Sequence, residues 1–296
     1  MTDDRRKRLR SALTSGRMIS APGVYDMVSA LLADHLGFDA IYMTGYGVVA
    51  SSLGLPDAGL ATYSDMIARV AMIAGRTTTP LIADADTGYG GLLNVAHTVR
   101  GYEQAGAAGL QLEDQEFPKK CGHTPDRRCI PVDDMVMKIR VAIDARKDPD
   151  LLIVARTDAR TEYGLDEAIR RAQAYAAAGA DMLFVEALES SAEMMEVCKR
   201  VDRPLIVNMV EGGKTPIMSA ADLSNAGFAI AIFPVAALLA ATSAMDQVYR
   251  YIKQSGSTVG MPTSLFPFPD MSRLMGFPAV WDFERRYAQN GKTTAR

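Results

Sequence analysis

Four segments of the chain repeat one layout, in which a glycine precedes a short apolar run and the segment ends at the seventh residue after that glycine. Glycine is well suited to the left-handed conformation that ends a helix. A continuous apolar run is typical of a parallel strand that is buried on both faces. Each segment therefore predicts a helix end followed by a buried strand. The segments are residues 37–44, 106–113, 179–186 and 227–234.

Further apolar runs bring the number of predicted strands to eight. Residues 80–84 (PLIAD) and 204–208 (PLIVN) share a second form of the pattern, and residues 18–23 and 151–158 are also strand-like. Helix-like segments such as 165–178 lie between them. Eight strand-then-helix units predict an α/β protein with a (β/α)₈ TIM-type barrel. An open doubly wound sheet is the alternative, but no GxGxxG turn follows the first strand.

Length and composition fit one domain that covers residues 1–296. With 48% hydrophobic residues, the 296-residue chain can bury a large core. Its 32 basic and 35 acidic residues give a formal charge of −3, without the basic stripe that binds nucleic acid or an anionic membrane. The charged start lacks the apolar segment of a secretion signal, so we expect a cytoplasmic protein. The three cysteines lack paired CxxC spacing and indicate no disulfide framework.

One apolar run, residues 228–245, approaches the length of a membrane-spanning helix. Pro234 interrupts this run, and its Ala-rich second half contains Thr242 and Ser243. We therefore expect a short buried strand followed by a helix, and no membrane span.

The active site of a (β/α)₈ barrel lies where the strands end. Polar residues at the ends of the predicted strands should therefore meet at one mouth of the barrel. These residues are Thr44, Asp84, Glu113, Arg156, Glu186 and Asn208.

Carboxylates are concentrated at this predicted mouth. Asp84 and Asp86 follow the third strand, Glu113 ends the fourth, and the glycine-rich loop after the second strand adds Asp57. Neighbouring acidic side chains repel one another unless a cation lies among them, and hard oxygen ligands suit Mg²⁺ or Mn²⁺. The sequence therefore predicts a magnesium site. The alternative is that these acids cap helices or pair with Arg156 and the lysines of the next loop.

The connector after the fourth strand, residues 113–131, contains the motif KKCGH. In this motif Cys121 lies between Lys120 and Gly122, next to His123. Cationic neighbours can tune a thiol for proton transfer. His123 either donates a hydrogen bond to the ion cluster or only holds the loop in place.

Together these residues resemble the isocitrate lyase and phosphoenolpyruvate mutase superfamily. The matching motifs are YMTGYGVVASSLGLPD, DADTGYGG, LEDQEFPKKCGH, VARTDAR, GADMLFVEA and NMVEGGKTP, in the family's order over roughly residues 18–250. The branch they resemble contains the 2-methylisocitrate and 2,3-dimethylmalate lyases. The resemblance implies a Mg²⁺-dependent barrel in which Asp57, Asp84, Asp86 and Glu113 hold the ion directly or through water.

The resemblance also implies roles for the other site residues. Loop 113–131 would be a mobile gate that delivers Cys121 as a proton donor. Arg156, with Lys120 and His123, would offset charge on the departing carboxylate. The base would be Tyr42 or a carboxylate relay through Glu186. The residues implied to contact substrate are Tyr42, Thr44, Gly45, Tyr46, Gly122, Arg156, Glu186 and Asn208.

Substrate choice depends on where this chain departs from its relatives. NMVEGGKTP replaces the Ser-Pro-Ser segment of isocitrate lyases proper, and Leu239 stands where 2-methylisocitrate lyases should carry an arginine for a third carboxylate. We therefore expect cleavage of 2,3-dimethylmalate or another 2-alkylmalate to pyruvate and a short carboxylic acid. The alternatives are 2-methylisocitrate cleavage, oxaloacetate hydrolysis or decarboxylation and, in another class, a non-catalytic metabolite-binding barrel.

Residues 260–296 follow the eighth unit and are rich in aromatic side chains, including the single tryptophan, Trp281. Eight helices already cover such a barrel, and an exposed apolar segment usually marks an interface. We therefore expect an additional C-terminal helical segment that serves oligomerisation. The resemblance implies that a helix near this end swaps onto a neighbouring barrel, giving a homotetramer built from two dimers.

Overall fold

A computed structural model describes residues 2–124 and 126–290 of the chain. It divides into two compact units, residues 1–239 and 240–296. The two units are described separately below, and the assignment of residues 1–296 to a single domain stays a prediction.

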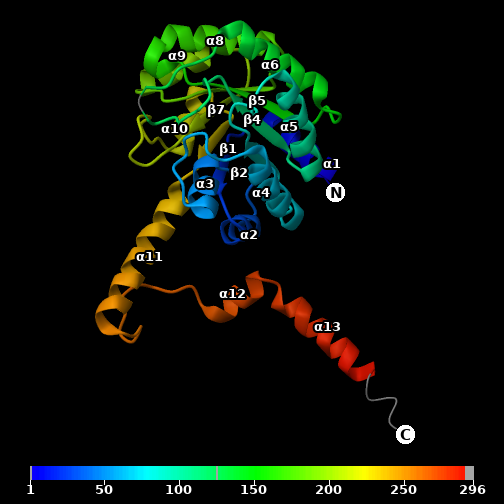
Figure 1. Cartoon of the computed structure of the whole chain (residues 1–296), viewed down its shortest axis with the longest axis vertical. Helices are drawn as coiled ribbons and strands as arrows, with labels where there is room; N and C mark the ends of the chain where they lie inside the picture. Colours follow the sequence, from blue (N-terminus) through cyan, green and yellow to red (C-terminus); the bar gives the residue numbers. More distant parts are fainter. Residues whose placement is uncertain (1, 125, 291–296) are drawn as a thin grey trace. The chain divides into compact units, whose positions relative to one another are not determined.

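Eight parallel strands pair in sequence order, and the last closes on the first to form a complete barrel (Figure 1). The predicted (β/α)₈ fold is confirmed, and each of the eight predicted segments overlaps one strand. The strands are β1 (Ile19–Val24), β2 (Ile41–Met43), β3 (Leu81–Asp84), β4 (Gly109–Glu113), β5 (Leu152–Thr157), β6 (Met182–Val185), β7 (Leu205–Asn208) and β8 (Ile230–Phe233).

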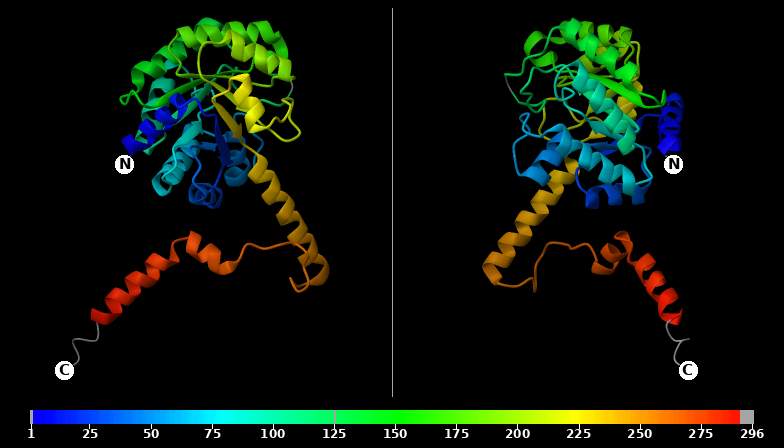
Figure 2. Two further views of the ribbon diagram at one scale, coloured as in Figure 1. Left: turned by 180° about the vertical axis from the view of Figure 1, so that it is seen from behind. Right: turned by 45° about the vertical axis from the view of Figure 1, so that its right-hand side comes forward.

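Helices follow the strands and surround the barrel, as both views of Figure 2 show. The helices that begin in the first unit are α1 (Thr2–Thr14), α2 (Met27–Leu36), α3 (Gly45–Leu53), α4 (Tyr63–Arg76), α5 (Leu92–Ala105), α6 (Val132–Ala145), α7 (Arg160–Tyr163), α8 (Leu165–Ala177), α9 (Ser191–Arg200), α10 (Ala220–Ala226) and α11 (Ala236–Ser255).

The glycines that open the four repeated segments explain why helix and strand alternate there. Their φ angles are positive, at 74° for Gly37, 98° for Gly106, 106° for Gly179 and 107° for Gly227. This left-handed conformation favours glycine because a side chain would be strained in it. The repeat in the sequence therefore marks the positions where the chain turns from a helix into the next strand.

The buried apolar residues form two clusters. One includes Ile19, Val154 and Phe184 of the strands, and the larger one joins other strand residues to the helices outside them. Leu9 of α1 belongs to the first cluster and is completely buried. Arg6 of the same helix donates hydrogen bonds to the carbonyls of Glu103 and Ala107, just before β4. Helix α1 therefore covers the N-terminal end of the barrel, opposite the strand ends.

The apolar run at 228–245 forms β8 and then the start of α11, as predicted. Across residues 2–124 and 126–290, no helix combines the length and apolar character that a bilayer span requires.

The second unit contains the remainder of α11 together with α12 (Phe268–Leu274) and α13 (Phe277–Asn290). The predicted helices beyond residue 260 are therefore present. Phe277 and Trp281 stack with ring centroids 5.9 Å apart, and the Phe283 and Tyr287 rings are 4.5 Å apart. These aromatic side chains are exposed, with Phe283 accessible over 60% of its surface.

Candidate active site

A cavity of about 310 Å³ lies at the C-terminal ends of the strands. The six polar residues predicted at the strand ends, Thr44 to Asn208, all line it. Other predicted residues in its wall are Tyr42, Tyr46, Asp57, Lys120, Cys121, Gly122, His123 and Leu239. Gly45 and Asp86 do not line the cavity themselves but lie next to residues that do. The Gly45 N–H donates to Asp84 Oδ2 over 3.3 Å. The carboxylates therefore share one space with the thiol and the basic residues.

The ends of β3 and β4 carry buried carboxylates. Asp84, Asp86 and Glu113 are each no more than 6% exposed. Asp86 follows the strand with a positive φ of 47°, and its N–H donates to Asp84 Oδ1. Burial raises the pKa of Asp86 to about 7, against the opposing effect of Lys119, and burial also raises the pKa values of Asp84 and Glu113. The cluster therefore favours bound positive charge.

Lys119 supplies that charge within the protein, as in the alternative that the acids pair with the lysines of the loop, although the sequence singled out Lys120 instead. Its Nζ lies 2.5 Å from Asp57 Oδ1 and 2.6 Å from Asp86 Oδ1, and the residue is buried. Lys120, which the sequence singled out, is exposed, and its Nζ donates to the Asp126 carbonyl over 3.4 Å. Adjacent side chains in an extended segment point in opposite directions, so only one of the two lysines can reach the cluster.

The carboxylates have the chemistry that a hard cation requires. Their donors are all oxygens, and Glu113 Oε1 is buried without a hydrogen-bond partner. In the described parts of the chain, no three or more His, Cys, Asp or Glu side chains are arranged to hold a metal ion. In this arrangement Lys119 draws Asp57 and Asp86 together. The residues fit Mg²⁺ by donor type, and a full coordination shell requires these side chains to adjust.

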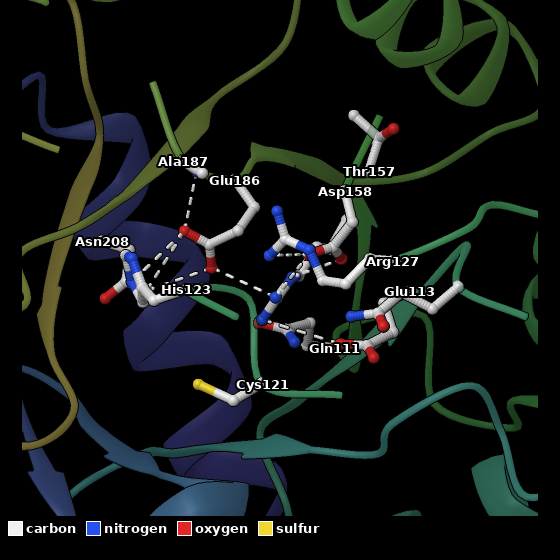
Figure 3. A network of polar contacts seen from close by, with 12 residues as sticks. Gln111, Glu113, Cys121, His123, Arg127, Thr157, Asp158, Glu186, Ala187 and Asn208 are labelled. Atoms are coloured by element: carbon white, nitrogen blue, oxygen red, sulfur yellow. Dashed lines mark hydrogen bonds and ion pairs between the residues drawn. The ribbon is translucent and has the colours of Figure 1, made fainter. Parts of the chain in front are cut away.

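Arg156 is the centre of a buried polar network at the ends of β5 and β6, and Figure 3 labels its partners Glu113, Asp158 and Glu186. Its Nε and Nη2 donate to the two carboxylate oxygens of Asp158 over 2.9 and 2.8 Å. Its Nη2 also lies 3.2 Å from Glu186 Oε2, and Nη1 lies 3.6 Å from Glu113 Oε2. Asn208 Nδ2 donates to Glu186 Oε2 over 3.1 Å. One guanidinium thus orders carboxylates from three strands.

His123 joins this network from the loop. Its Nδ1 accepts a hydrogen bond from the Lys214 N–H over 3.3 Å, and its Nε2 lies 3.7 Å from Glu186 Oε1. Burial lowers the pKa of His123, although Glu186 opposes this effect. Its Nε2 faces Glu186 and Asn208, so His123 contacts the carboxylate network rather than Asp84 or Asp86.

Cys121 and Gly122 place the loop against Arg156 and Glu186. The Cys121 N–H donates to the Asp57 carbonyl over 3.1 Å, and burial raises the pKa of its thiol. A Cβ on Gly122 would lie 2.3 Å from Arg156 Nη2 and 2.8 Å from Glu186 Cγ. Only a glycine allows the loop backbone to approach this pair so closely. The thiol is thus kept protonated at the edge of the cavity.

Tyr42 lies on the floor of the cavity. Its hydroxyl donates to Gln111 Oε1 over 2.9 Å, and burial, together with Asp84, raises its pKa well above the usual value. The phenol is therefore a hydrogen-bond donor, and its anion is strongly disfavoured. Thr44 caps α3 by accepting a hydrogen bond from the Gly47 N–H.

Three further residues at the site were not singled out by the sequence: Gln111, Arg127 and Asp158. Asp158 is two residues after Arg156 in the motif VARTDAR, a spacing that puts both side chains on one face of an extended segment. That spacing could have identified Asp158 as a partner of Arg156. Neither Gln111, inside an apolar run, nor Arg127, in a charged loop, carries a pattern that distinguishes it.

The wall near the start of α11 is apolar. It is formed by Ile232, Pro234, Val235 and Leu239, and no arginine or lysine occurs among these four residues. This part of the cavity suits an alkyl group better than a carboxylate.

Comparisons with known proteins agree with this fold. A family model described as phosphoenolpyruvate phosphomutase matches residues 9–253. The chain is 44% identical to 2,3-dimethylmalate lyase of Eubacterium barkeri, covering 95% of this chain and 97% of that protein. It is 43% identical to 2-methylisocitrate lyase of Aeropyrum pernix, covering 95% of this chain and 89% of that protein.

Two solved structures have the same architecture. Oxaloacetate acetylhydrolase, in complex with the inhibitor 3,3-difluorooxalacetate, matches with a TM-score of 0.89 and 35% identity over 95% of this chain and 96% of that one. Phosphonopyruvate hydrolase, in complex with oxalate and Mg²⁺, matches with a TM-score of 0.86 and 30% identity over 96% and 99%.

Fold and site thus define a (β/α)₈ enzyme whose cavity holds acids, a guanidinium and a protonated thiol. The chain belongs to the phosphoenolpyruvate phosphomutase family, within the isocitrate lyase and phosphoenolpyruvate mutase superfamily, and is a carbon–carbon lyase.

Proposed function

We propose that the enzyme is a Mg²⁺-dependent lyase that cleaves a 2-alkylmalate, with 2,3-dimethylmalate the preferred substrate. The observation that carries this proposal is the apolar wall around Leu239, where a third carboxylate would find no cation. A buried carboxylate without a partner costs several kcal/mol. The 44% identity to a 2,3-dimethylmalate lyase supports the same substrate class.

In this proposal Asp57, Asp84, Asp86 and Glu113 hold the ion directly or through water. The oxygen donors and the unpartnered Glu113 Oε1 support it, as does the Mg²⁺ complex of the related phosphonopyruvate hydrolase. When bound, the ion would act as a Lewis acid on the 2-hydroxyl and carboxylate oxygens of the substrate. Mn²⁺ could fill the same role.

Carbon–carbon cleavage moves one proton at each end of the breaking bond. The base takes the proton of the 2-hydroxyl, the O–H electron pair forms the carbonyl of pyruvate, and the C2–C3 bond breaks. Its electron pair passes to C3, next to the departing carboxylate, and Cys121 gives its thiol proton to C3. A proton then returns from the base to the thiolate before the next turnover. The raised pKa of Cys121 supports a thiol that arrives protonated.

Glu186 suits the base better than Tyr42. A tyrosine base must first lose its own proton, and burial raises the pKa of Tyr42 far above its usual value. Glu186 lies 3.7 Å from His123 Nε2 and receives a hydrogen bond from Asn208, so its carboxylate is held at the cavity beside the loop that carries Cys121. Arg156 and Lys119 offset the charge that grows on the departing carboxylate. Tyr42, Thr44, Gly45, Tyr46 and Gly122 complete the proposed substrate contacts, and Lys120 contributes positive charge at the rim.

Cleavage of 2-methylisocitrate and hydrolysis of oxaloacetate are the competing activities, because relatives that share most of this chain carry those names. A panel assay decides among them. Pyruvate release is measured for 2,3-dimethylmalate, other 2-alkylmalates and 2-methylisocitrate, and oxalate release for oxaloacetate, with and without EDTA. We expect the highest kcat/KM for an alkylmalate.

The variant Leu239→Arg sharpens this test. A new guanidinium in the apolar wall should raise the kcat/KM ratio of 2-methylisocitrate to 2,3-dimethylmalate by at least tenfold, and Val235→Leu is the control that keeps the wall apolar. A wild-type enzyme that clearly prefers 2-methylisocitrate would refute the substrate proposal.

We further propose a homotetramer of cytoplasmic location, formed by two dimers. The exposed aromatic side chains of α12 and α13 support an interface in residues 260–296.

A further inference from the structure

Arg127 is a charged side chain that is completely buried. It lies in the loop after β4, six residues beyond Cys121, and its side chain has no exposed surface. Its Nη2 donates to Thr161 Oγ1 over 2.6 Å, and its Nη1 lies 3.2 Å from Asp158 Oδ1. A buried guanidinium is costly unless it is paired, so Asp158 is essential to its placement.

The carboxylate of Asp158 therefore lies between two guanidiniums. Arg156 contacts both oxygens of Asp158, and Arg127 contacts Oδ1. In Figure 3 Arg127 and Glu113 lie on one side of the network, and His123 and Asn208 lie on the other. Arg127 does not line the cavity, whereas Arg156 does.

We propose that Arg127 is a positioning residue for the reaction, because its charge, 3.2 Å from Oδ1, holds the carboxylate of Asp158 in place and thereby aims the guanidinium of Arg156 at Glu186 and the cavity. The paired hydrogen bonds between a guanidinium and a carboxylate depend on the relative orientation of their planes. Without Arg127, Oδ1 of Asp158 loses one of its two cations, and the carboxylate, still bonded to Arg156 through both oxygens, can shift. Arg156 would turn with it.

This position also connects two parts of the site. Arg127 comes from the loop that carries Cys121, while Asp158 and Thr161 follow β5, which carries Arg156. The pairing therefore fixes the position of Cys121, the proposed acid, relative to Arg156, the proposed charge-stabilising residue. A displacement of about 1 Å between catalytic groups can lower turnover about 100-fold.

The role in turnover rests on the function proposed above, and the test compares two buried arginines. Arg127→Gln removes the charge, and Arg127→Lys keeps the charge without the planar fork. Arg6→Gln is the matched control, because Arg6 is also buried and ion-paired, with Nη1 2.8 Å from Asp148, at the opposite end of the barrel. Thermal unfolding of all three variants reports stability.

We expect Arg6→Gln and Arg127→Gln both to lower the melting temperature. Arg127→Gln should also lower kcat on the acid that the wild type cleaves by about 10- to 100-fold, with KM changed less than about threefold. A lower kcat with a nearly unchanged KM is expected when a group acts in the transition state. Arg127→Lys should recover part of kcat, and Arg6→Gln should keep kcat within about twofold. Equal kcat losses in both Gln variants, or none in Arg127→Gln, would overturn the proposal.

A crystal structure of Arg127→Gln gives a readout that does not depend on turnover. The distance from Arg156 Nη2 to Glu186 Oε2, 3.2 Å in the wild type, should exceed about 4 Å. If this pair is unchanged, the proposal fails even when kcat is low. If Arg127→Gln does not fold, the distance from Arg156 Nη2 to Glu186 Oε2 and the value of kcat are measured in Arg127→Lys instead. An unchanged distance in that variant would also overturn the proposal. If the wild type cleaves none of the tested acids, the proposed function fails, and the distance still tests the positioning.

Discussion

Nζ of Lys119 lies 2.6 Å from Oδ1 of Asp86 at the centre of the carboxylate cluster. The same ammonium lies 2.5 Å from Oδ1 of Asp57 in the loop after α3, so one loop lysine already neutralises part of the acidic charge gathered there. A divalent cation would therefore add to the positive charge of Lys119, which already lies in the cluster. The lysine reduces the repulsion among the acids, and Oε1 of Glu113 is left without a hydrogen-bond partner.

The first prediction concerns the metal. EDTA should abolish pyruvate release, and added Mg²⁺ should restore it. Mg²⁺ should also raise the melting temperature of the apo-protein, because an ion that binds only the folded state stabilises it by about 2.7 kcal/mol at 100 times its Kd. The variant Asp84→Asn should lose that increase, whereas Asp166→Asn, an exposed carboxylate, should retain it. Turnover that is insensitive to EDTA contradicts the metal site.

The second prediction concerns the proposed acid. Cys121→Ser should lower kcat by a factor of about 10² to 10⁴, because a serine hydroxyl is a much weaker acid than a thiol. The melting temperature should stay close to that of the wild type. Cys198→Ser is the control, since Cys198 lies in α9 and does not line the cavity. A Cys121→Ser enzyme with near-normal turnover excludes the thiol as donor.

The third prediction concerns assembly. Light scattering should find the intact chain as a tetramer at micromolar concentration. A chain that ends at Val259 lacks α12 and α13 with their exposed aromatic side chains, and it should dissociate or aggregate. Trp281→Ala combined with Phe283→Ala should weaken assembly without shortening the chain. A monomeric intact protein, or a truncated chain with unchanged assembly, refutes this prediction.

The fourth prediction concerns a stabilising carboxylate outside the site. Asp34 Oδ1 accepts hydrogen bonds from the N–H and hydroxyl groups of Thr78 and Thr79. Burial acts to raise the pKa of Asp34, but the bonds from the two threonines dominate and lower it. Because the folded-state pKa is below the unfolded value of about 3.9, the charge stabilises the fold above that pH.

Asp34→Asn should therefore lower the free energy of unfolding by about 1 kcal/mol at pH 7. The difference from wild type should shrink as the pH falls below about 4 and through the lowered pKa of Asp34. Urea unfolding between pH 2.5 and 7 measures this change. Asp39→Asn removes an exposed pair with Arg17 and should change stability by less than about 0.5 kcal/mol at any pH. A pH-independent effect of Asp34→Asn would show that its charge is not involved.

The barrel could be predicted from the sequence because it repeats. A glycine before an apolar run recurs in four units and a proline before one recurs in two more, and the polar residue after most of these runs marks a strand end. This logic also placed Asp84, Glu113 and Glu186 around one cavity, since parallel strands end on the same side of a barrel.

The loop contacts could not be predicted in the same way. A lysine in a loop is exposed by default, yet Lys119 is buried and Lys120 is not. Arg127 likewise lies in a charged loop and is buried only because Asp158, 31 positions later, receives it. The burial of a charge depends on a partner brought in by the fold, and no periodic pattern in the chain encodes that partner.

Gly122 has a consequence for how the site is probed. The loop rests against Arg156 and Glu186 at a position where no atom beyond the glycine backbone can fit. The fit therefore depends on a missing methyl group rather than on a bond. Mutations that shorten side chains will not reveal the need for a glycine at position 122, because such mutations only remove contacts. Adding a single carbon at Gly122 would instead act as a wedge, separating the loop from the barrel while every reactive group remains in the chain.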